Sequence, residues 1–136
     1  MLRLVCLLVL VSTATANLAG GLADAAIDED VKELAEKSVA QENAQSNNAF
    51  YWRLDKVEKV RRQVVAGTLI HLDLIFVETV CKRSQMSPDE MTERDCDVKT
   101  DGKKIQCYFT VWQKPWAKFE EIEKKNCKPL KKREKQ

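Results

Sequence analysis

Five cysteines and a single histidine are the residues of this 136-residue chain best suited to nucleophilic catalysis or to metal binding. Zinc sites are typically built from closely spaced ligand pairs such as C-x-x-C. Four of the cysteines lie in the C-terminal half without any C-x-x-C pair, and His71 is distant from them: they are Cys81, Cys96, Cys107 and Cys127. A zinc site is therefore the weaker interpretation, and we expect neither a metal nor a cofactor.

The first residues have the pattern of an export signal. One basic residue, Arg3, precedes a short apolar run that ends in the small residues Ala14-Thr15-Ala16. This arrangement is typical of a secretory signal peptide, and the run is too short to cross a bilayer. We therefore expect residues 1–16 to be removed, Cys6 included. Residues 17–136 are expected to form one secreted, extracellular domain.

In an exported chain the four remaining cysteines are expected to form two disulfides, for which the sequence alone allows three pairings. Oxidised cysteines are not nucleophiles, and a Ser or Cys hydrolase also needs a base and a group that orients it. His71 lies in an alternating, strand-like run, where it most simply points to solvent. The sequence contains neither a Gly-rich phosphate loop nor a G-x-S-x-G turn. We therefore expect a binding protein rather than an enzyme.

The charges of the chain argue against nucleic acid as the partner. The 23 Lys and Arg residues nearly balance the 21 Asp and Glu residues. A nucleic-acid binder typically carries a field of one sign. The basic run at residues 131–135 is local, and we interpret it as a solvated tail. No apolar stretch after residue 16 is long enough to span a membrane.

Three short features, far apart in the sequence, are candidates for binding. The first is Leu18-Ala19-Gly20-Gly21, the second is Gln63-Val64-Val65-Ala66-Gly67, and the third is Pro115-Trp116. Each has an ordinary explanation when taken singly: a flexible start, a hairpin turn and a half-buried aromatic residue. Their joint meaning depends on the elements that position them.

Those elements follow from the periodicity of the chain. Residues 28–45 have apolar side chains at helical spacing after an acidic start and predict one helix. Residues 50–65, 68–77 and 105–111 are strand-like, and residues 82–104 are interpreted as a long polar loop bounded by cysteines. Residues 17–26 contain glycine and are expected to form a mobile arm. The pattern predicts an α+β domain in which the helix packs on an antiparallel sheet.

The ordered set of a Gly-containing arm, a Q-x-V-x-G hairpin and a Pro-Trp pair resembles the type-2 cystatins, a family of secreted cysteine protease inhibitors. The resemblance covers essentially the whole chain after residue 16. It implies a cystatin-like antiparallel β-sheet wrapped around one long α-helix. It also implies two C-terminal disulfides, Cys81 with Cys96 and Cys107 with Cys127, the first enclosing a longer insertion than in vertebrate members.

The resemblance also implies a mechanism and a set of site residues. In this family the arm and both hairpins form a wedge that enters the active-site cleft of papain-like cysteine proteases of the cathepsin L, B or S kind. Inhibition by a monomer would be reversible and competitive, with Leu18 in the main apolar pocket. The protease-binding residues implied by the resemblance are Leu18, Ala19, Gly20, Gln63, Val64, Val65, Ala66, Gly67, Pro115 and Trp116.

A second site is implied after the helix. Some type-2 cystatins inhibit legumain, an asparagine-specific protease, through a Ser-Asn-Asp loop. Here the matching segment is Ser46-Asn47-Asn48, in which Asn48 replaces the preferred Asp and Asn47 would enter the legumain pocket. An ordinary helix-ending turn explains these residues equally well.

Two alternatives remain open. The first is a secreted cystatin-fold binding or immune-modulating protein without protease inhibition. In such a protein we would expect loss of the arm glycine, the hairpin glutamine or the Pro-Trp pair, and all of these are present. The second is an antimicrobial or polyanion-binding precursor that depends on the basic tail.

Overall fold

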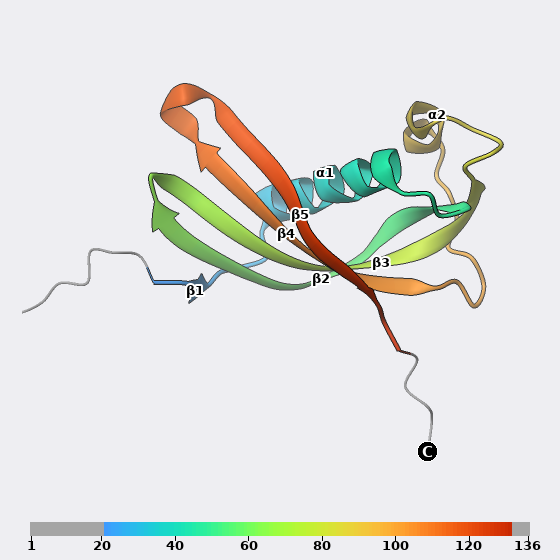
Figure 1. Ribbon diagram of the computed structural model, residues 1–136, viewed down its shortest axis with the longest axis horizontal. Coiled ribbons are helices and arrows are strands. Elements are labelled where there is room, and N and C mark those ends of the chain that lie inside the picture. Colours follow the sequence, from blue (N-terminus) through green and yellow to red (C-terminus); the bar gives the residue numbers. More distant parts are fainter. Residues whose placement is uncertain (1–20, 132–136) are drawn as a thin grey trace, which may run out of the picture.

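The computed structural model describes residues 21–131 and shows an antiparallel sheet with one long helix across one face (Figure 1). The five strands are ordered β1-β2-β3-β4-β5 in the sheet, as in the chain. The elements are β1 (Ala23–Asp24), α1 (Glu29–Gln45), β2 (Phe50–Val65), β3 (Gly67–Lys82), α2 (Pro88–Glu93), β4 (Lys104–Lys114), a 3₁₀ turn (Pro115–Ala117) and β5 (Phe119–Pro129). This confirms the predicted α+β fold. The expected signal peptide, residues 1–16, lies outside the described residues.

The long helix α1 begins and ends where the sequence predicts. Asp28 caps its N-terminus, since the Oδ1 atom accepts a hydrogen bond from the Val31 N–H at 2.9 Å. Glu29 and Asp30 in the first turn complement the helix dipole. The helix ends at Ser46, which has an extended backbone. The buried stripe of α1 therefore lies in a fixed register against the sheet.

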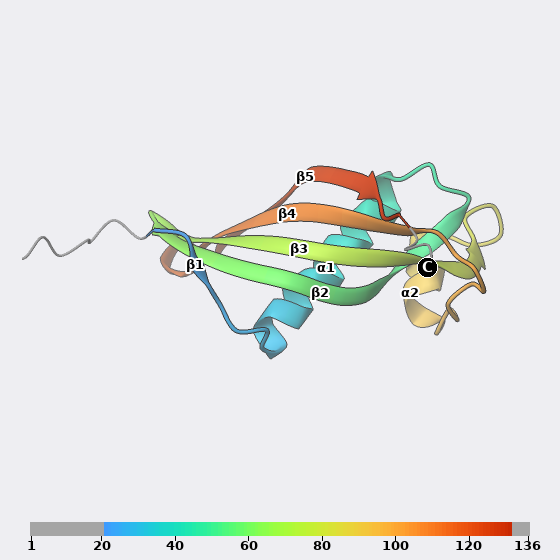
Figure 2. The same cartoon turned by 90° about the horizontal axis from the view of Figure 1, so that it is seen from below.

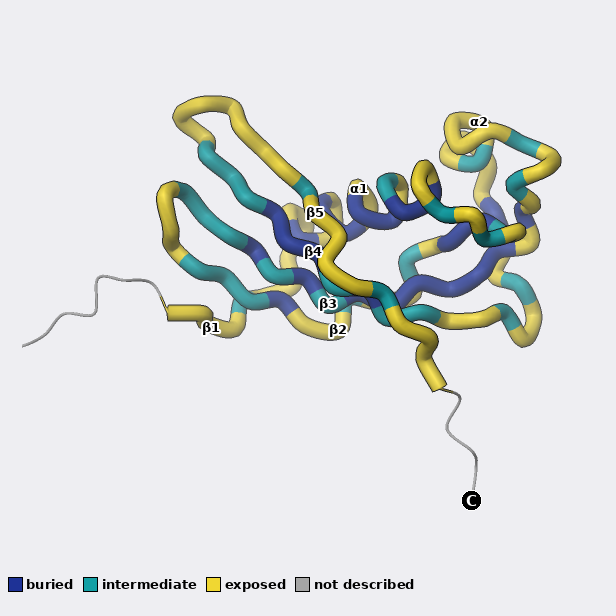
Figure 3. The backbone as a smooth tube through the Cα atoms, viewed as in Figure 1, coloured by how far each residue is buried: buried dark blue, intermediate teal, exposed yellow. Residues whose placement is uncertain are grey.

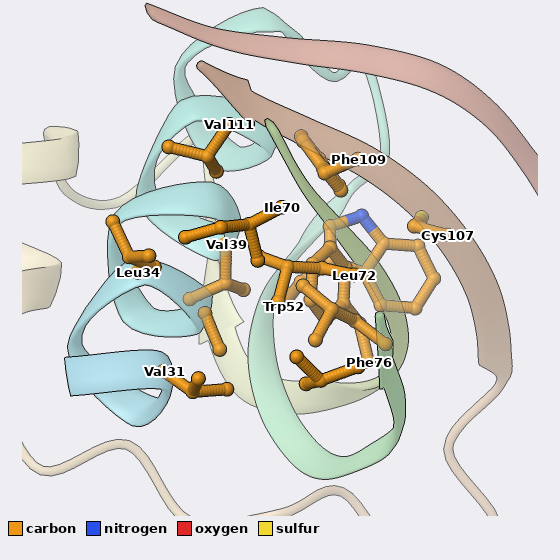
Figure 4. Packing of buried hydrophobic residues seen from close by; sticks show 13 residues of the cluster. Val31, Leu34, Val39, Trp52, Ile70, Leu72, Phe76, Cys107, Phe109 and Val111 are labelled. Atoms are coloured by element: carbon orange, nitrogen blue, oxygen red, sulfur yellow. The ribbon is translucent and has the colours of Figure 1, made fainter. Parts of the chain in front are cut away.

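The core lies between α1 and the inner face of the sheet (Figure 4). Val31, Leu34 and Val39 of the helix meet alternate residues of the strands. The strand residues of this core are Trp52, Val60, Ile70, Leu72, Leu74, Phe76, Cys107, Phe109 and Val111. Burial of each large apolar side chain contributes about 1.5–3 kcal/mol, so this face fixes which strand residues point outward.

The hairpin formed by β2 and β3 is long and curved. Each strand has 16 residues, and Val65 pairs with Gly67 across a tip made by Ala66. Three irregularities in β2, between Phe50 and Lys59, interrupt the pairing. Such bulges increase strand twist and bend, and the sheet crosses α1 as a twisted layer (Figure 2). The hairpin tip is thereby held at one end of the molecule.

The two disulfides are Cys81–Cys96 and Cys107–Cys127, which confirms the pairing implied by the resemblance. The first of them, together with a small second core, holds the opposite end of the sheet. Tyr51 is buried beside the first of these bonds. The segment predicted as a plain loop contains α2, capped by Ser87, and a bridge between Thr79 and Val98. The loop prediction was therefore wrong in this part.

Two further predictions differ from the structure. Residues 17–26 were expected to form a mobile arm, but Ala23 and Asp24 pair with Arg62 and Arg61 as strand β1. No clear strand was predicted after the Pro-Trp pair, where β5 is found.

Among the described residues no helix is long and apolar enough to cross a membrane.

Candidate functional site

The tips of two hairpins lie side by side at one end of the sheet (Figure 1). The β2–β3 tip is Val65-Ala66-Gly67, and the β4–β5 tip is Pro115-Trp116-Ala117. They adjoin because β3 and β4 are neighbours whose paired residues continue to Thr68 and Gln113. The structure therefore brings together two of the three features singled out in the sequence, Gln63 to Gly67 and Pro115-Trp116.

Of the first feature, Leu18-Ala19-Gly20-Gly21, only Gly21 is among the described residues, and it lies towards the same end. Because β1 is antiparallel to β2, Gly21 and Leu22 lie on the side of Ala23 that faces the β2–β3 tip. Gly21 and Leu22 are exposed there. Leu18, Ala19 and Gly20 lie outside the described residues.

Both tips are exposed to solvent (Figure 3), and their exposed residues include the apolar Val64, Val65 and Trp116. The exposed fraction is 66% for Val64 and 71% for Trp116. Trp116 is therefore not the half-buried aromatic residue of the ordinary explanation. Exposed aromatic residues near other apolar side chains are typical anchors of protein interfaces. These two tips form what we call the apolar edge, made of Val64, Val65, Ala66, Pro115 and Trp116.

Gly67 allows the two hairpins to approach closely. Its φ angle is +98°, in the region that favours glycine. A Cβ atom at this position would lie 2.1 Å from the backbone oxygen of Gln113 on β4. Any side chain here would therefore push the two tips apart.

Trp112 joins the two tips, and sequence reasoning missed it. Its indole Nε1 atom donates a hydrogen bond to the Ala66 carbonyl oxygen at 2.9 Å. The ring meets Phe119 edge-on at 5.5 Å between centroids. The Lys114 ammonium lies 3.9 Å from the centroid of the Trp112 ring. An aromatic residue at an outward position of β4, next to buried Val111 and close to the Pro-Trp pair, was the available signal.

The β4–β5 tip has a tight conformation. Pro115 opens a 3₁₀ turn, and Lys118 closes it with φ +48°. The Lys118 N–H donates to the Pro115 carbonyl oxygen at 3.2 Å. The fixed φ of proline limits the conformations of the turn, so Trp116 is presented from a well-defined backbone.

The segment Ser46-Asn47-Asn48 lies at the other end of the sheet, where β2 begins and β3 ends (Figure 1). The side chain of Asn47 is exposed. The Asn48 Nδ2 atom donates hydrogen bonds to the Phe50 carbonyl oxygen at 2.8 Å and to the Glu78 Oε2 atom at 2.9 Å. The Asn48 N–H also donates to the Ser46 Oγ atom at 3.1 Å. The loop is thus held on both sides of Asn47.

Glu78 is the second residue that sequence reasoning missed. Its side chain is 4% exposed, and its Oε1 atom accepts a hydrogen bond from the Lys103 N–H at 2.9 Å. Burial raises the pKa of this carboxyl group, but hydrogen bonds from Asn48 and Lys103 and the charges of Lys99 and Lys103 outweigh it, so the pKa lies below its ordinary value. Glu78 is therefore charged at neutral pH and requires a donor at position 48.

The potential catalytic and metal-binding residues are separated or occupied. All four cysteines after residue 16 form disulfides. Across residues 21–131 there is no group of three or more His, Cys, Asp and Glu side chains that could hold a metal ion. His71 was expected to point to solvent, but it is half-buried, and its Nε2 atom is enclosed without a hydrogen-bond partner.

Comparison with known proteins gives one consistent family. The Cystatin domain family matches residues 20–116. A cystatin from Cryptophis nigrescens is 36% identical over 130 residues, which cover 93% of this chain and 92% of the relative. A cystatin from Oxyuranus scutellatus scutellatus is 35% identical over the same length and coverage.

Solved structures agree with this assignment. The crystal structure of Al-CPI superposes with a TM-score of 0.72 and 35% identity, over 82% of this chain and all of that chain. The crystal structure of dimeric human cystatin F gives a TM-score of 0.66 and 25% identity, over 93% of this chain and 98% of that chain. The sequence relatives, the matched domain and the shared fold together show that this chain belongs to the cystatin family.

Proposed function

We propose that this protein is a secreted, reversible and competitive inhibitor of papain-like cysteine proteases. The observation that carries the proposal is the apolar edge, in which Val64, Val65 and Trp116 are exposed on two adjoining hairpins. Two contacts hold these hairpins in a fixed relation: the close approach of Gly67 to Gln113, and the hydrogen bond from Trp112 to Ala66. A pre-organised edge loses little conformational entropy on binding.

The edge would act by occupying the substrate cleft. The β2–β3 tip is narrow because Ala66 alone separates the paired residues Val65 and Gly67. Trp116 supplies a large, rigid apolar surface beside it. Leu18 and Ala19 are proposed to fill the non-primed pockets, with Gly20 turning the chain away from the catalytic thiolate. No strained or extended peptide bond needs to enter the catalytic centre, so the inhibitor leaves intact.

Titration against papain and a cathepsin L-like enzyme tests this proposal. We expect stoichiometric, competitive inhibition in the nanomolar range or tighter. Trp116→Ala and Gly20→Glu should each weaken binding by more than about 1 kcal/mol. Val98→Ala is the matched control, because Val98 is 50% exposed but lies at the other end of the sheet. Absence of inhibition by the wild-type protein would favour a non-inhibitory cystatin, and unchanged affinity in both edge variants would rule out the apolar edge.

We propose inhibition of legumain as a second activity of the opposite end. The specific observation in its favour is an exposed Asn47 on a loop braced by Asn48, Glu78 and Arg83. The Arg83 Nε atom donates to the Asn48 carbonyl oxygen at 3.0 Å. Glu78 also accounts for the departure from the family motif, since an aspartate at position 48 would face a second buried carboxylate.

Two asparagine substitutions test the second activity. Asn47→Lys should abolish inhibition of legumain and leave inhibition of papain intact. Asn126→Lys is the matched control, because Asn126 is also exposed but lies on β5. Equal effects of the two variants on legumain, or no inhibition by the wild-type protein, would contradict the proposal.

A further inference from the structure

The outer face of the sheet, turned away from α1, contains a small pocket centred on His71. Ile70 and Leu72 point into the core, so the alternation of the strand places His71 on the opposite face. Arg61 on β2 and Thr110 on β4 are its cross-strand partners. The pocket has a volume of about 80 Å³, and β5 contributes Lys125 to its lining.

The charges that line this pocket are mostly positive. Lys59, Arg61 and Lys125 face a single carboxylate, Asp73, which already accepts a hydrogen bond from the Gln106 Nε2 atom at 2.8 Å. Among the residues that the structure describes, Arg61 has no ion-pair partner. The remaining two cations have exposed partners, with 3.6 Å between Lys59 and Asp24 and 3.0 Å between Lys125 and Glu123. Exposed ion pairs of this kind are weak.

The imidazole of His71 has an unfilled hydrogen-bonding position. Its Nε2 atom is buried, and no protein group reaches it. A buried polar atom without a partner lowers stability. Burial, Arg61 and Lys125 all lower the pKa of His71, so the ring is neutral at pH 7. A bound anion would offset the two positive charges, and a rotation of the ring that turned Nε2 towards the pocket would let the anion accept a hydrogen bond from it.

We propose that this pocket binds one oxyanion, a sulfate or phosphate group, held by Arg61 and Lys125 with His71 donating from beneath. The pocket is small, and its size suits a group such as a single tetrahedral anion. Arginine and lysine are the usual ligands of such anions. The pocket is separate from both the apolar edge and the Asn47 loop, so its occupancy leaves both free.

The affinity of the pocket for the anion should rise as the pH falls. Around His71 lie Lys59 and Arg61 from β2, Asp73 from its own strand, Tyr108 and Thr110 from β4, and Lys125 and Glu123 from β5. Of these groups and the ring, only His71 ordinarily titrates between pH 5 and 8. Protonation would give it a second N–H donor and a positive charge, and the anion would stabilise that charged form. A tenfold gain in affinity corresponds to about one unit of upward pKa shift on binding.

Inorganic sulfate is the probe, because its charge does not change across this range. Binding is measured by calorimetry and by amide chemical shifts at constant ionic strength, at about pH 5.5 and about pH 8, on either side of the ordinary pKa of a histidine. We expect shifts at His71 and Thr110 and affinity roughly tenfold higher at the lower pH. Arg61→Gln should weaken binding at least about fivefold at both pH values. His71→Gln should remove the pH dependence.

Lys56→Gln is the matched control, since it removes one cation from the same strand, where Lys56 pairs with Glu58 at 2.8 Å outside the pocket. Sulfate affinity that is unaffected by Arg61→Gln, or affected equally by Lys56→Gln, would overturn the site. Absence of sulfate binding to the wild-type protein would also overturn the site.

A heparin column in the same buffers distinguishes a sulfate group carried by a polysaccharide from a free sulfate ion as the occupant of the pocket. Earlier elution of Arg61→Gln than of Lys56→Gln indicates a sulfate ester of a polysaccharide, and equal elution indicates the free ion.

Discussion

Trp112 and Trp116 have different roles although they lie on one hairpin. Trp116 is exposed and available to a partner, whereas Trp112 is half-buried and bonded to Ala66 of the neighbouring tip. The second residue therefore positions the first relative to Val64 and Val65. The Pro-Trp pair can be recognised as a motif in the sequence, whereas the bond from Trp112 to Ala66 becomes visible only in the structure.

Trp112→Phe tests the positioning role. The variant keeps an aromatic ring against Phe119 and Lys114 but loses the N–H donor to Ala66. We expect affinity for papain to fall about three- to tenfold, which is the net value of one such hydrogen bond, chiefly through faster dissociation. Tyr108→Phe, an aromatic change on the same strand, should have no effect. Equal dissociation rates for wild-type and Trp112→Phe would show that the bond does not order the edge.

Gly67→Ala tests the close approach of the two hairpins. The new methyl group would meet the Gln113 backbone oxygen, and the positive φ angle adds backbone strain. We expect a loss of roughly 1–3 kcal/mol in the free energy of unfolding, measured by urea denaturation, together with weaker inhibition. Gly21→Ala is the control, because nothing lies within 4 Å of a Cβ atom there. Similar results for the two alanine variants would contradict the packing argument.

The ionisation of Glu78 makes the free energy of unfolding depend on pH. Because its pKa in the fold is lower than the ordinary 4.5, the unfolded chain binds the proton more readily. The stabilisation is therefore present above about pH 4.5 and is lost as the pH falls through the lowered value. Glu78→Gln should flatten this part of the curve of unfolding free energy against pH. An unchanged slope below pH 4.5 in the variant would show that Glu78 does not contribute.

The elements best predicted from sequence are those with one buried face. The helix α1 has apolar residues at helical spacing, and strands β3 and β4 alternate apolar and polar residues against the same core, so periodicity locates them. Strand β2 has no regular alternation and is recognised by its β-branched and aromatic residues. Strand β5 has almost no buried residue, and β1 has only two residues. Neither has a periodic signal, since an exposed edge strand is defined by its hydrogen bonds rather than by its side chains. Likewise α2 is fixed by Ser87 and the Cys81–Cys96 bond rather than by an apolar stripe.

The Cys81–Cys96 bond stabilises α2 and the Asn47 end without reaching the apolar edge. Cys81 and Cys96 are 15 residues apart in the chain, and replacing both with serine opens the loop that their bond closes. The chain-entropy model predicts that the free energy of unfolding then falls by about 3 kcal/mol. We expect a lower urea midpoint and unaltered stoichiometry against papain at low temperature. Loss of papain inhibition by the folded variant would show that the two ends are coupled.

The two proposed binding ends are far apart in the molecule. The 16-residue strands β2 and β3 join them, which corresponds to about 50 Å at 3.3 Å per residue. We expect one inhibitor to bind a papain-like enzyme and legumain at the same time. Light scattering of the three-component mixture should give the mass of a 1:1:1 complex. Displacement of one protease by the other would contradict independent sites.

The exposed residues of the candidate site could be predicted from the sequence, whereas the residues that hold them in position could not. Val64, Val65, Gly67 and Trp116 belong to short motifs whose order in the chain is distinctive. Trp112 and Glu78 act through contacts between residues 46 and 30 positions apart in the chain, respectively. Such pairs can be found only when the register of the strands is known.

The disulfide across β4 and β5 closes the hairpin into a ring. Cys107 and Cys127 are directly opposite in the register, and Trp116 lies at the apex between them. If a protease were to cut the chain beside Trp116, both new ends would remain tethered, one through β4 and the other through the sulfur bridge. Such nicked inhibitor would gain the mass of one water without losing a fragment, and only reduction would release the second half.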